Sequence, residues 1–295
     1  MQPMLSIVVA NYNYARFLPD AFSSIFRQCG DPVIDAGRAV LPVNGCEAVI
    51  ELIVCDAEST DGSVEIIKAN EDRIAWWCSE KDAGQSDAFN KGFFHARGQW
   101  LTWLNADDLY FSGVFEALYK VVQKHPQAEW ITGNKVHFDS DSGRMVSVNW
   151  GPHCQPPLLR GNQAISAVFG PSTFFKKVLY ERMGPIDERL HYAMDSAYWA
   201  KFTMAGVRQI RLNKLCWAFR DHTESKTVGI QTKAVADRRR GETELWRKDT
   251  GYRFEVSFKN VWYWAWALWR VIDGSWVVRA IMKHRYEGES IKEII

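Results

Sequence analysis

The sequence predicts an α/β fold in which a mostly parallel, Rossmann-like central sheet is flanked by helices. Short apolar, β-branched segments alternate with segments whose apolar residues recur at helical spacing. Such alternation of strand and helix is typical of a parallel sheet with helices on its faces. A chain of 295 residues is also long enough to bury one large core and carry a small appendage.

The first half of the chain carries the clearest signals. Four apolar runs are expected to be buried strands, at residues 5–9, 51–55, 74–78 and 100–104. Helices are expected at about 17–26, 61–67, 86–96 and 109–124. Gly, Pro, Asp and Asn are frequent in residues 30–47, so we expect a loop insertion there.

The second half predicts a more varied set of elements. Strands are expected at 130–133 and 172–175, a hairpin pairs 136–138 with 145–148, and a helix covers about 195–206. We interpret residues 1–228 as one domain. Residues 229–295 are expected to form a helical, aromatic-rich C-terminal extension.

Composition excludes several classes of protein. The 36 Lys and Arg residues nearly balance the 35 Asp and Glu residues, which argues against a nucleic-acid partner held by charge. The six cysteines form no CxxC pair and no zinc-ligand spacing, so reduced thiols are expected. The N-terminus has no charged leader with a cleavage site, and no apolar stretch is long enough to span a bilayer. We therefore expect a cytoplasmic protein.

Polar clusters follow three of the predicted strands. They are Asn11-Tyr12-Asn13, residues 56–63 and Asn105-Ala106-Asp107-Asp108. In a parallel sheet these strand ends meet at one edge, where open α/β folds bind ligands. The residue types suit a nucleotide, with Tyr12 as a ring face for a base and Asp56 as an acceptor. The carboxylates of the third cluster are hard ligands for Mg²⁺ or Mn²⁺.

At the level of the whole chain, the motifs resemble those of the family 2 inverting glycosyltransferases, which have the GT-A fold. The resemblance covers about residues 4–228. Its segments are 6–13, 56–63, Glu80-Lys81-Asp82-Ala83-Gly84-Gln85, Asn90-Lys91-Gly92, Ala96-Arg97-Gly98, 104–108, Gly184-Pro185-Ile186-Asp187-Glu188, Met194-Asp195 and 220–227. Each motif alone is weak, but their common order is specific.

The resemblance implies a nucleotide-sugar half in about residues 1–110 and an acceptor half in 111–228. It implies that Asp56 and Asp82 contact the nucleoside and that Asp195 is the catalytic base. Asn105-Ala106-Asp107 takes the place of the DxD motif, so Asp107 is the expected ligand of Mn²⁺ or Mg²⁺. Other expected contacts with the donor are Asn11, Tyr12, Asn13, Gln85, Lys91, Asn105 and Ala106; His222 is expected near the metal or the diphosphate, and Lys226 near the diphosphate.

Position 105 departs from the family pattern, because an amide replaces the first carboxylate of DxD. An amide oxygen still accepts a hydrogen bond from a ribose hydroxyl, but it adds no charge for a cation.

Several side chains have a structural alternative. Tyr12 could be a core or turn aromatic, Asp56 a turn residue, and His222 a structural histidine. Lys91 could pair with Asp87 four residues earlier rather than with phosphate. Asp108 is either an outer ligand of the metal or the cap of the following helix. As the base, Asp195 competes with Asp187 and Glu188.

The C-terminal extension combines tryptophan with basic residues. Its aromatic run, residues 262–269, is followed by Arg270, Arg279, Lys283, His284 and Arg285. This composition is typical of an interfacial membrane helix. We expect residues 252–285 either to contact the inner face of a membrane or to pack on the catalytic domain or a second subunit.

The predicted function is a metal-dependent inverting transfer of a sugar. The expected donor is a nucleoside-diphosphate sugar, with UDP as the first choice, and the acceptor is a glycan or a lipid-linked glycan. The alternative is a non-catalytic member of the same fold that binds a nucleotide or glycan as an assembly partner, which the amide at position 105 motivates. A dinucleotide-dependent oxidoreductase is excluded, because no G-x-G-x-x-G follows the first strand.

Overall fold

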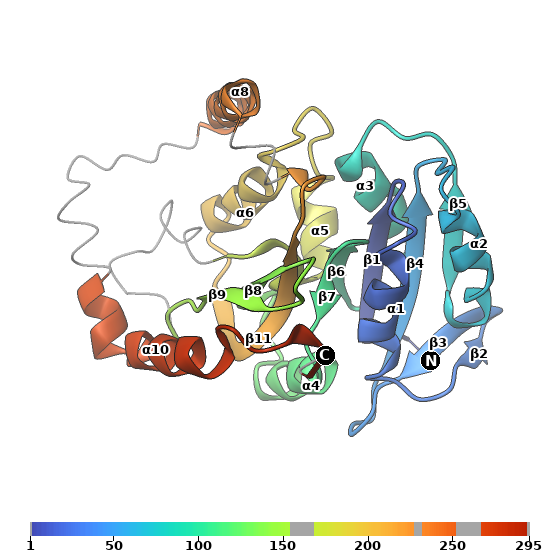
Figure 1. The fold of residues 1–295 in the computed structure, drawn as a ribbon, viewed down its shortest axis with the longest axis horizontal. Helices are drawn as coiled ribbons and strands as arrows, with labels where there is room; N and C mark the ends of the chain where they lie inside the picture. Colours follow the sequence, from blue (N-terminus) through green and yellow to red (C-terminus); the bar gives the residue numbers. More distant parts are fainter. Residues whose placement is uncertain (1, 154–167, 227–231, 252–266, 294–295) are drawn as a thin grey trace.

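The computed structural model describes residues 2–153, 168–226, 232–251 and 267–293. Strands from these residues form one eleven-stranded sheet with helices on both faces (Figure 1). No helix in the described ranges is both long and apolar enough to cross a membrane. The five cysteines within those ranges are free thiols, and Cys154 lies outside them.

The N-terminal part of the sheet is built on four parallel strands, as predicted. They are β1 (Leu5–Asn11), β4 (Val49–Asp56), β5 (Trp76–Ser79) and β6 (Trp100–Asn105), in the order β5-β4-β1-β6. The register places Asn11 opposite Asp56 and Ala10 opposite Asn105. The polar ends of β1, β4 and β6 therefore lie side by side.

Alternate residues of β1 face two separate apolar clusters. Leu5, Ile7 and Val9 pack in the cluster that holds α1 (Leu18–Phe26), while Val8 packs in the cluster of α3 (Gln85–His95). This is the two-residue periodicity of a strand buried on both faces. A Cβ on Gly92 of α3 would come within 2.3 Å of Val8, so only glycine allows this close approach.

The expected loop insertion at 30–47 is wrong in part. It contains a hairpin of β2 (Val33–Asp35) and β3 (Arg38–Pro42), and β3 pairs antiparallel with β4. The turn residues Ala36 and Gly37 both have positive φ, at 49° and 76°, as a two-residue hairpin turn requires. Alanine seldom occupies such a position, so the turn residues hide the hairpin.

Residues after α3 and β6 add antiparallel pairs to the sheet. Residues 130–133 and 136–138 belong to one continuous strand, β8 (Trp130–Asp139), which pairs with β9 (Met145–Asn149) and β10 (Thr173–Lys176). The expected helix at 109–124 begins only at α4 (Val114–Lys124), because β7 (Leu109–Tyr110) precedes it. Three further helices are α2 (Ser63–Lys68), α5 (Lys177–Met183) and α6 (Met194–Met204).

One long strand was not predicted. β11 (Gln209–Asp221) runs parallel to β8 over most of its length. Charged and amide side chains at 211, 213 and 214 interrupt its apolar pattern. Arg211 is nevertheless buried, because its guanidinium donates to Gly133 O at 3.1 Å and to Asn134 Oδ1 at 2.6 Å.

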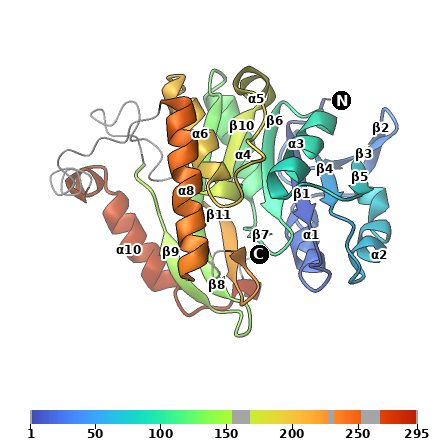
Figure 2. The same cartoon turned by 90° about the horizontal axis from the view of Figure 1, so that it is seen from above.

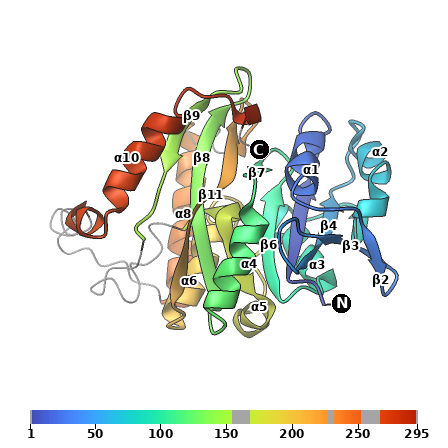
Figure 3. The ribbon, with the colours of Figure 1, turned by 90° about the horizontal axis from the view of Figure 1, so that it is seen from below.

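Helices cover both faces of the sheet. Helices α3, α5, α6 and α8 (Lys233–Thr250) lie on one face (Figure 2), and α1, α2, α4 and α10 (Ser275–Tyr286) lie on the other (Figure 3). The C-terminal extension thus contributes a helix to each face. Most of the aromatic run, residues 262–266, lies outside the described residues.

Candidate active site

The ends of the parallel strands open into a cavity of about 710 Å³. Its walls come from the ends of β1 and β6, the start of α3, the start of α6 and β11. Eight of the predicted site residues line it: Asn11, Tyr12, Asp82, Gln85, Asn105, Asp107, Asp195 and Lys226. The predicted residues that do not line it are Asn13, Asp56, Lys91, Ala106, Asp108 and His222.

Tyr12 is not a core aromatic, because 62 % of the residue is exposed. It follows Asn11 at the end of β1, and both residues line the cavity. Asn13 lies beside them with φ of 54° and holds the loop after β4, since its Oδ1 accepts the Thr60 N–H at 3.0 Å. Tyr12 therefore presents an exposed aromatic ring at the wall of the cavity.

Asp56 is buried and joins the strand ends to one another. Its Oδ1 accepts from Asn11 Nδ2 at 2.7 Å and from Ser59 Oγ at 2.6 Å. Its Oδ2 accepts from Ser79 Oγ at 2.6 Å and from the Ser59 N–H at 3.0 Å. Both oxygens are engaged by protein donors, so direct contact with a nucleoside requires the exchange of at least one of these bonds. The role of Asp56 as a nucleoside contact stays a prediction.

A chain of side chains runs along the floor of the cavity from α3 to β6. Lys226 Nζ donates to Gln85 Oε1 at 3.3 Å, and Gln85 Nε2 donates to Asn105 Oδ1 at 2.5 Å. Burial lowers the pKa of Lys226 and raises that of Asp82. Asp82 is half-buried, so an ionic ligand interacts with it more strongly than with a surface group, whereas Lys226 remains open to solvent.

Asp108 is a buried structural carboxylate rather than a helix cap. It accepts from Asn105 Nδ2 at 2.9 Å and from the Arg220 N–H at 3.1 Å, and α4 begins only after Gly113. Burial, and then the neighbouring Asp107 carboxylate, hold the pKa of Asp108 well above its ordinary value. The amide at position 105 thus supplies a donor that Asp108 needs.

Asp107 and His222 form a pair at the cavity, although 115 positions separate them in the chain. His222 Nε2 lies 3.0 Å from Asp107 Oδ2. Asp107 Oδ1 is buried without a hydrogen-bond partner among the described residues, and so is His222 Nδ1. The imidazole is held by ring contacts with Phe17 and Tyr14, at centroid distances of 4.7 and 5.6 Å.

This pair fits a divalent cation that takes its remaining ligands from elsewhere. A carboxylate oxygen and an imidazole nitrogen are both ligands that divalent cations accept, and the two groups would exchange their mutual hydrogen bond for such an ion. Within the described residues, no group of three His, Cys, Asp or Glu side chains is arranged around a metal. Ions such as Mg²⁺ are commonly held by one or two carboxylates together with substrate phosphates and water.

Asp195 is the candidate base that lines the cavity. It lies in the first turn of α6, where its Oδ1 accepts the Ser196 N–H at 2.6 Å. The competing carboxylates point elsewhere: Asp187 pairs with Arg189 at 2.7 Å, and Glu188 accepts from Asn90 at 3.0 Å. Neither lines the cavity.

The predicted partner of Lys91 is wrong. Lys91 Nζ pairs with Glu80 Oε1 at 2.7 Å, while Asp87 accepts the Ala83 N–H. Lys91 does not line the cavity, and its role as a contact with the donor stays a prediction.

Sequence reasoning missed the aromatic wall opposite the strand ends. Trp217 and Phe219 of β11 line the cavity, together with His191, Tyr192, Gly170 and Pro171. The signal was the alternation of Trp217 and Phe219, which indicates that both side chains lie on one face of a strand. Recognising it required β11 to be recognised first.

Comparison with known sequences gives a consistent assignment. Residues 6–184 match the family described as "Glycosyl transferase family 2". Glycosyltransferase GlyG of Streptococcus pneumoniae is 28 % identical over 146 residues, covering 48 % of this chain and 42 % of that protein. A PGL/p-HBAD biosynthesis glycosyltransferase of Mycobacterium bovis is 26 % identical over 200 residues, 65 % of this chain and 67 % of its own. The chain spans between 42 % and 58 % of the first four curated relatives.

Solved structures share the fold. S. aureus TarS 1–349 in complex with UDP-GlcNAc has a TM-score of 0.57 at 15 % identity, over 75 % of this chain and 59 % of that one. Mannosyltransferase PcManGT from Pyrobaculum calidifontis, in complex with GDP-Man and Mn²⁺, has a TM-score of 0.51 at 17 % identity, over 96 % and 87 %. With the family match over more than half of its length, the chain belongs to glycosyltransferase family 2 and has the GT-A fold.

Proposed function

We propose that this protein transfers a sugar, with inversion, from a nucleoside-diphosphate sugar to a glycan or a lipid-linked glycan. The proposal rests on the side chains that meet at one cavity. The Asp107–His222 pair meets its floor, and Asp195 lies on its wall. A site for a charged leaving group and a separate carboxylate base are what a single displacement needs.

We propose UDP as the nucleotide of the donor. Two forms of TarS were solved with UDP or UDP-GlcNAc, and PcManGT with GDP-Man, so related structures accept this class of ligand. In this chain the exposed Tyr12 ring offers a stacking surface for a base, and Asp82 offers an acceptor on the same wall.

Asp107 and His222 would hold Mn²⁺ or Mg²⁺ in the proposed enzyme. Such an ion, when bound, offsets the negative charge that develops on the departing diphosphate. Lys226, which lines the same cavity, would bind that diphosphate directly. Gln85 links Lys226 to Asn105 and so keeps the ammonium group at the floor of the cavity.

Asp195 would accept the proton of the acceptor hydroxyl. As that oxygen forms its bond to the anomeric carbon, the bond from this carbon to the diphosphate oxygen breaks. A single displacement of this kind inverts the anomeric configuration and needs no covalent nucleophile. Trp217 and Phe219 line the same cavity as Asp195, and their rings would contact the apolar faces of acceptor sugar rings.

The non-catalytic alternative depends on the amide at position 105. The structure offers another account of that residue, because Asn105 donates to the buried Asp108 while Asp107 keeps an unpartnered oxygen. The hydrogen bond that Asn105 donates to Asp108 thus explains why an amide takes the place of a carboxylate at position 105. This supports the catalytic reading.

We also propose that α10 rests on an anionic membrane surface. Val278, Met282 and Tyr286 pack against the domain, and on the opposite side of the helix Trp276 and Ile281 are each 56 % exposed. At 100° per residue, Arg279 and Lys283 fall between the packed and the exposed sides. An interfacial helix has this arrangement, in which apolar side chains face outward and basic side chains lie beside them.

Donor binding should depend on Asp107. We expect UDP with Mn²⁺ to raise the melting temperature of the wild type, because a ligand that binds only the folded state stabilises it. In Asp107→Ala this shift should fall by more than half. A panel of UDP-, GDP- and dTDP-sugars, each with and without Mn²⁺, is measured by thermal shift. The proposal fails if no nucleotide shifts the wild type.

Replacing the base should separate chemistry from binding. Asp195→Asn is expected to lower kcat by at least about 10²-fold, because the amide cannot accept the proton. Its affinity for the donor, measured by calorimetry, should match the wild type. Glu188→Gln serves as a control, since Glu188 does not line the cavity. Unchanged transfer by Asp195→Asn would show that another group is the base.

Restoring a carboxylate at position 105 should destabilise the protein. Asn105→Asp removes the donor to Asp108 and places two carboxylates together, at a cost of about 2 kcal/mol at pH 8. The pair raises its own pKa, so the loss should shrink as the pH falls towards 5 and a shared proton restores the hydrogen bond. Urea unfolding at both pH values measures this. The double change Asn105→Asp with Asp108→Asn should recover most of the loss; equal stability of single variant and wild type at pH 8 contradicts the account.

Membrane contact should depend on the outer side of α10. Trp276→Ser with Ile281→Ser is expected to reduce co-sedimentation with phosphatidylglycerol vesicles several-fold, because both side chains leave water when the helix inserts. Phe94→Ser is the matched control, since Phe94 is 81 % exposed on α3. Binding that is equal for the α10 variant and the wild type would refute membrane contact through this helix.

A further inference from the structure

A single carboxylate from the C-terminal extension holds the segment that leads into α6. Glu242 Oε2 accepts the backbone N–H groups of His191, Tyr192 and Ala193, at 3.0, 2.7 and 3.1 Å. Glu242 is only 7 % exposed. Three successive N–H groups that converge on one point form an anion-binding concavity, and here the anion is supplied by the protein itself.

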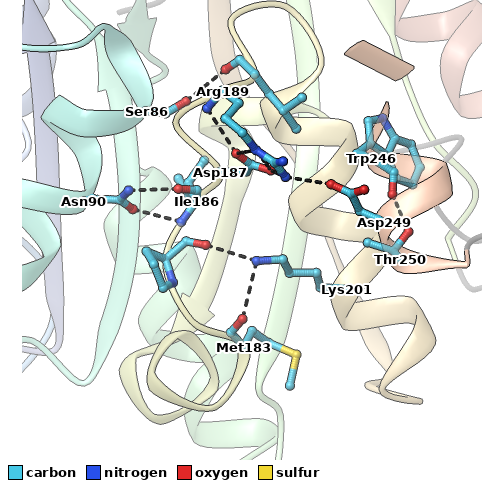
Figure 4. A network of polar contacts seen from close by, with 12 residues as sticks. Ser86, Asn90, Met183, Ile186, Asp187, Arg189, Lys201, Trp246, Asp249 and Thr250 are labelled. Atoms are coloured by element: carbon cyan, nitrogen blue, oxygen red, sulfur yellow. Dashed lines mark hydrogen bonds and ion pairs between the residues drawn. The ribbon is translucent and has the colours of Figure 1, made fainter. Parts of the chain in front are cut away.

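The segment that Glu242 holds is part of the cavity. His191 and Tyr192 line it, and Asp195 lies two residues beyond Ala193 in the first turn of α6. On its other side the same segment is tied to α3, because Ser86 Oγ donates to Leu190 O at 3.1 Å and Asn90 exchanges two hydrogen bonds of 2.9 Å with Ile186 (Figure 4). Residues 186–193 therefore connect α3 with α8.

Further contacts fasten α8 in this position. Trp246 is buried in the apolar cluster that contains Ala197 and Trp199 of α6. Arg189 pairs with Asp249 at 2.7 Å, next to its pair with Asp187 (Figure 4). Arg238 lies one turn before Glu242 in α8. Its guanidinium lies 5.6 Å from the Tyr192 ring centroid, and its Nε lies 3.5 Å from Glu242 Oε1. One side of α8 is thus fitted to the loop between α5 and α6.

We propose that Glu242 is a positioning residue for transfer, through which the C-terminal extension sets the place of Asp195 and of the acceptor-side wall. This inference rests on the proposed function. It assigns to α8, which lies beyond the matched residues 6–184, a part in the chemical step rather than in donor binding. Without the carboxylate, three buried N–H groups lose their acceptor, so the segment must move towards water or another partner.

The test compares Glu242→Ala and Glu242→Gln with Glu244→Gln, an exposed carboxylate of the same helix. At a temperature well below every melting midpoint, Glu242→Ala should lower kcat about 10²-fold, the loss expected for a displacement of about 1 Å at the reacting centre. Glu242→Gln keeps an oxygen acceptor without the charge, so an intermediate loss is expected. The affinity for UDP with Mn²⁺ should stay within twofold, and Glu244→Gln should behave as the wild type.

A purely structural role of Glu242 would lower the melting temperature and leave kcat unchanged below it, which would overturn the proposal. Hydrogen exchange over residues 190–197 provides a second measurement that does not need activity. Faster exchange in Glu242→Ala is expected there, and unchanged exchange would also overturn the proposal. If the wild type transfers no sugar at all, the proposed function fails, while the exchange measurement still decides whether Glu242 orders the segment.

Discussion

The parallel register of β4, β1 and β6 is the constraint on which the rest of this structure depends. It sets Asn11 beside Asp56 and Ala10 beside Asn105, so three polar strand ends share one edge. A slip of one residue would turn each strand over and bury polar side chains in the core. Asp56 secures this register at the open end by hydrogen bonds to Asn11, Ser59 and Ser79. The cavity is the space that these aligned ends leave open.

Buried carboxylates surround the cavity, and their donors distinguish them. Asp56, Asp108 and Glu242 each accept two or more hydrogen bonds from the protein, which is the condition under which a carboxylate is tolerated away from water. Asp107 instead has one oxygen against His222 and one without a partner among the described residues. Its unmet capacity points to a ligand from outside the chain. The same comparison explains why an amide, rather than a second acid, stands at position 105.

The C-terminal extension joins two parts of the proposed activity. Its first helix, α8, faces inward and supports the segment before Asp195, whereas α10 packs on β9 and turns apolar side chains outward. If α10 rests on a membrane, the same extension that completes the acceptor side also brings the enzyme to the surface where a lipid-linked acceptor would be found. In the proposed activity, the extension would then take part both in positioning Asp195 and in membrane contact.

The four parallel strands, the helices between them and the polar residues at their ends are predictable from the sequence, because hydrophobic periodicity and chain breaks are local properties. The side-chain contacts of those residues depend on the tertiary structure. β11 places His222 next to Asp107, and this strand was not predicted because polar residues interrupt its apolar pattern. The ion-pair partner of Lys91 is Glu80 rather than Asp87. The tertiary structure also surrounds Asp108 with protein donors and joins Glu242 to the segment before Asp195. Such pairings depend on which distant segments pack together, and this information is not contained in the spacing of residues along the chain.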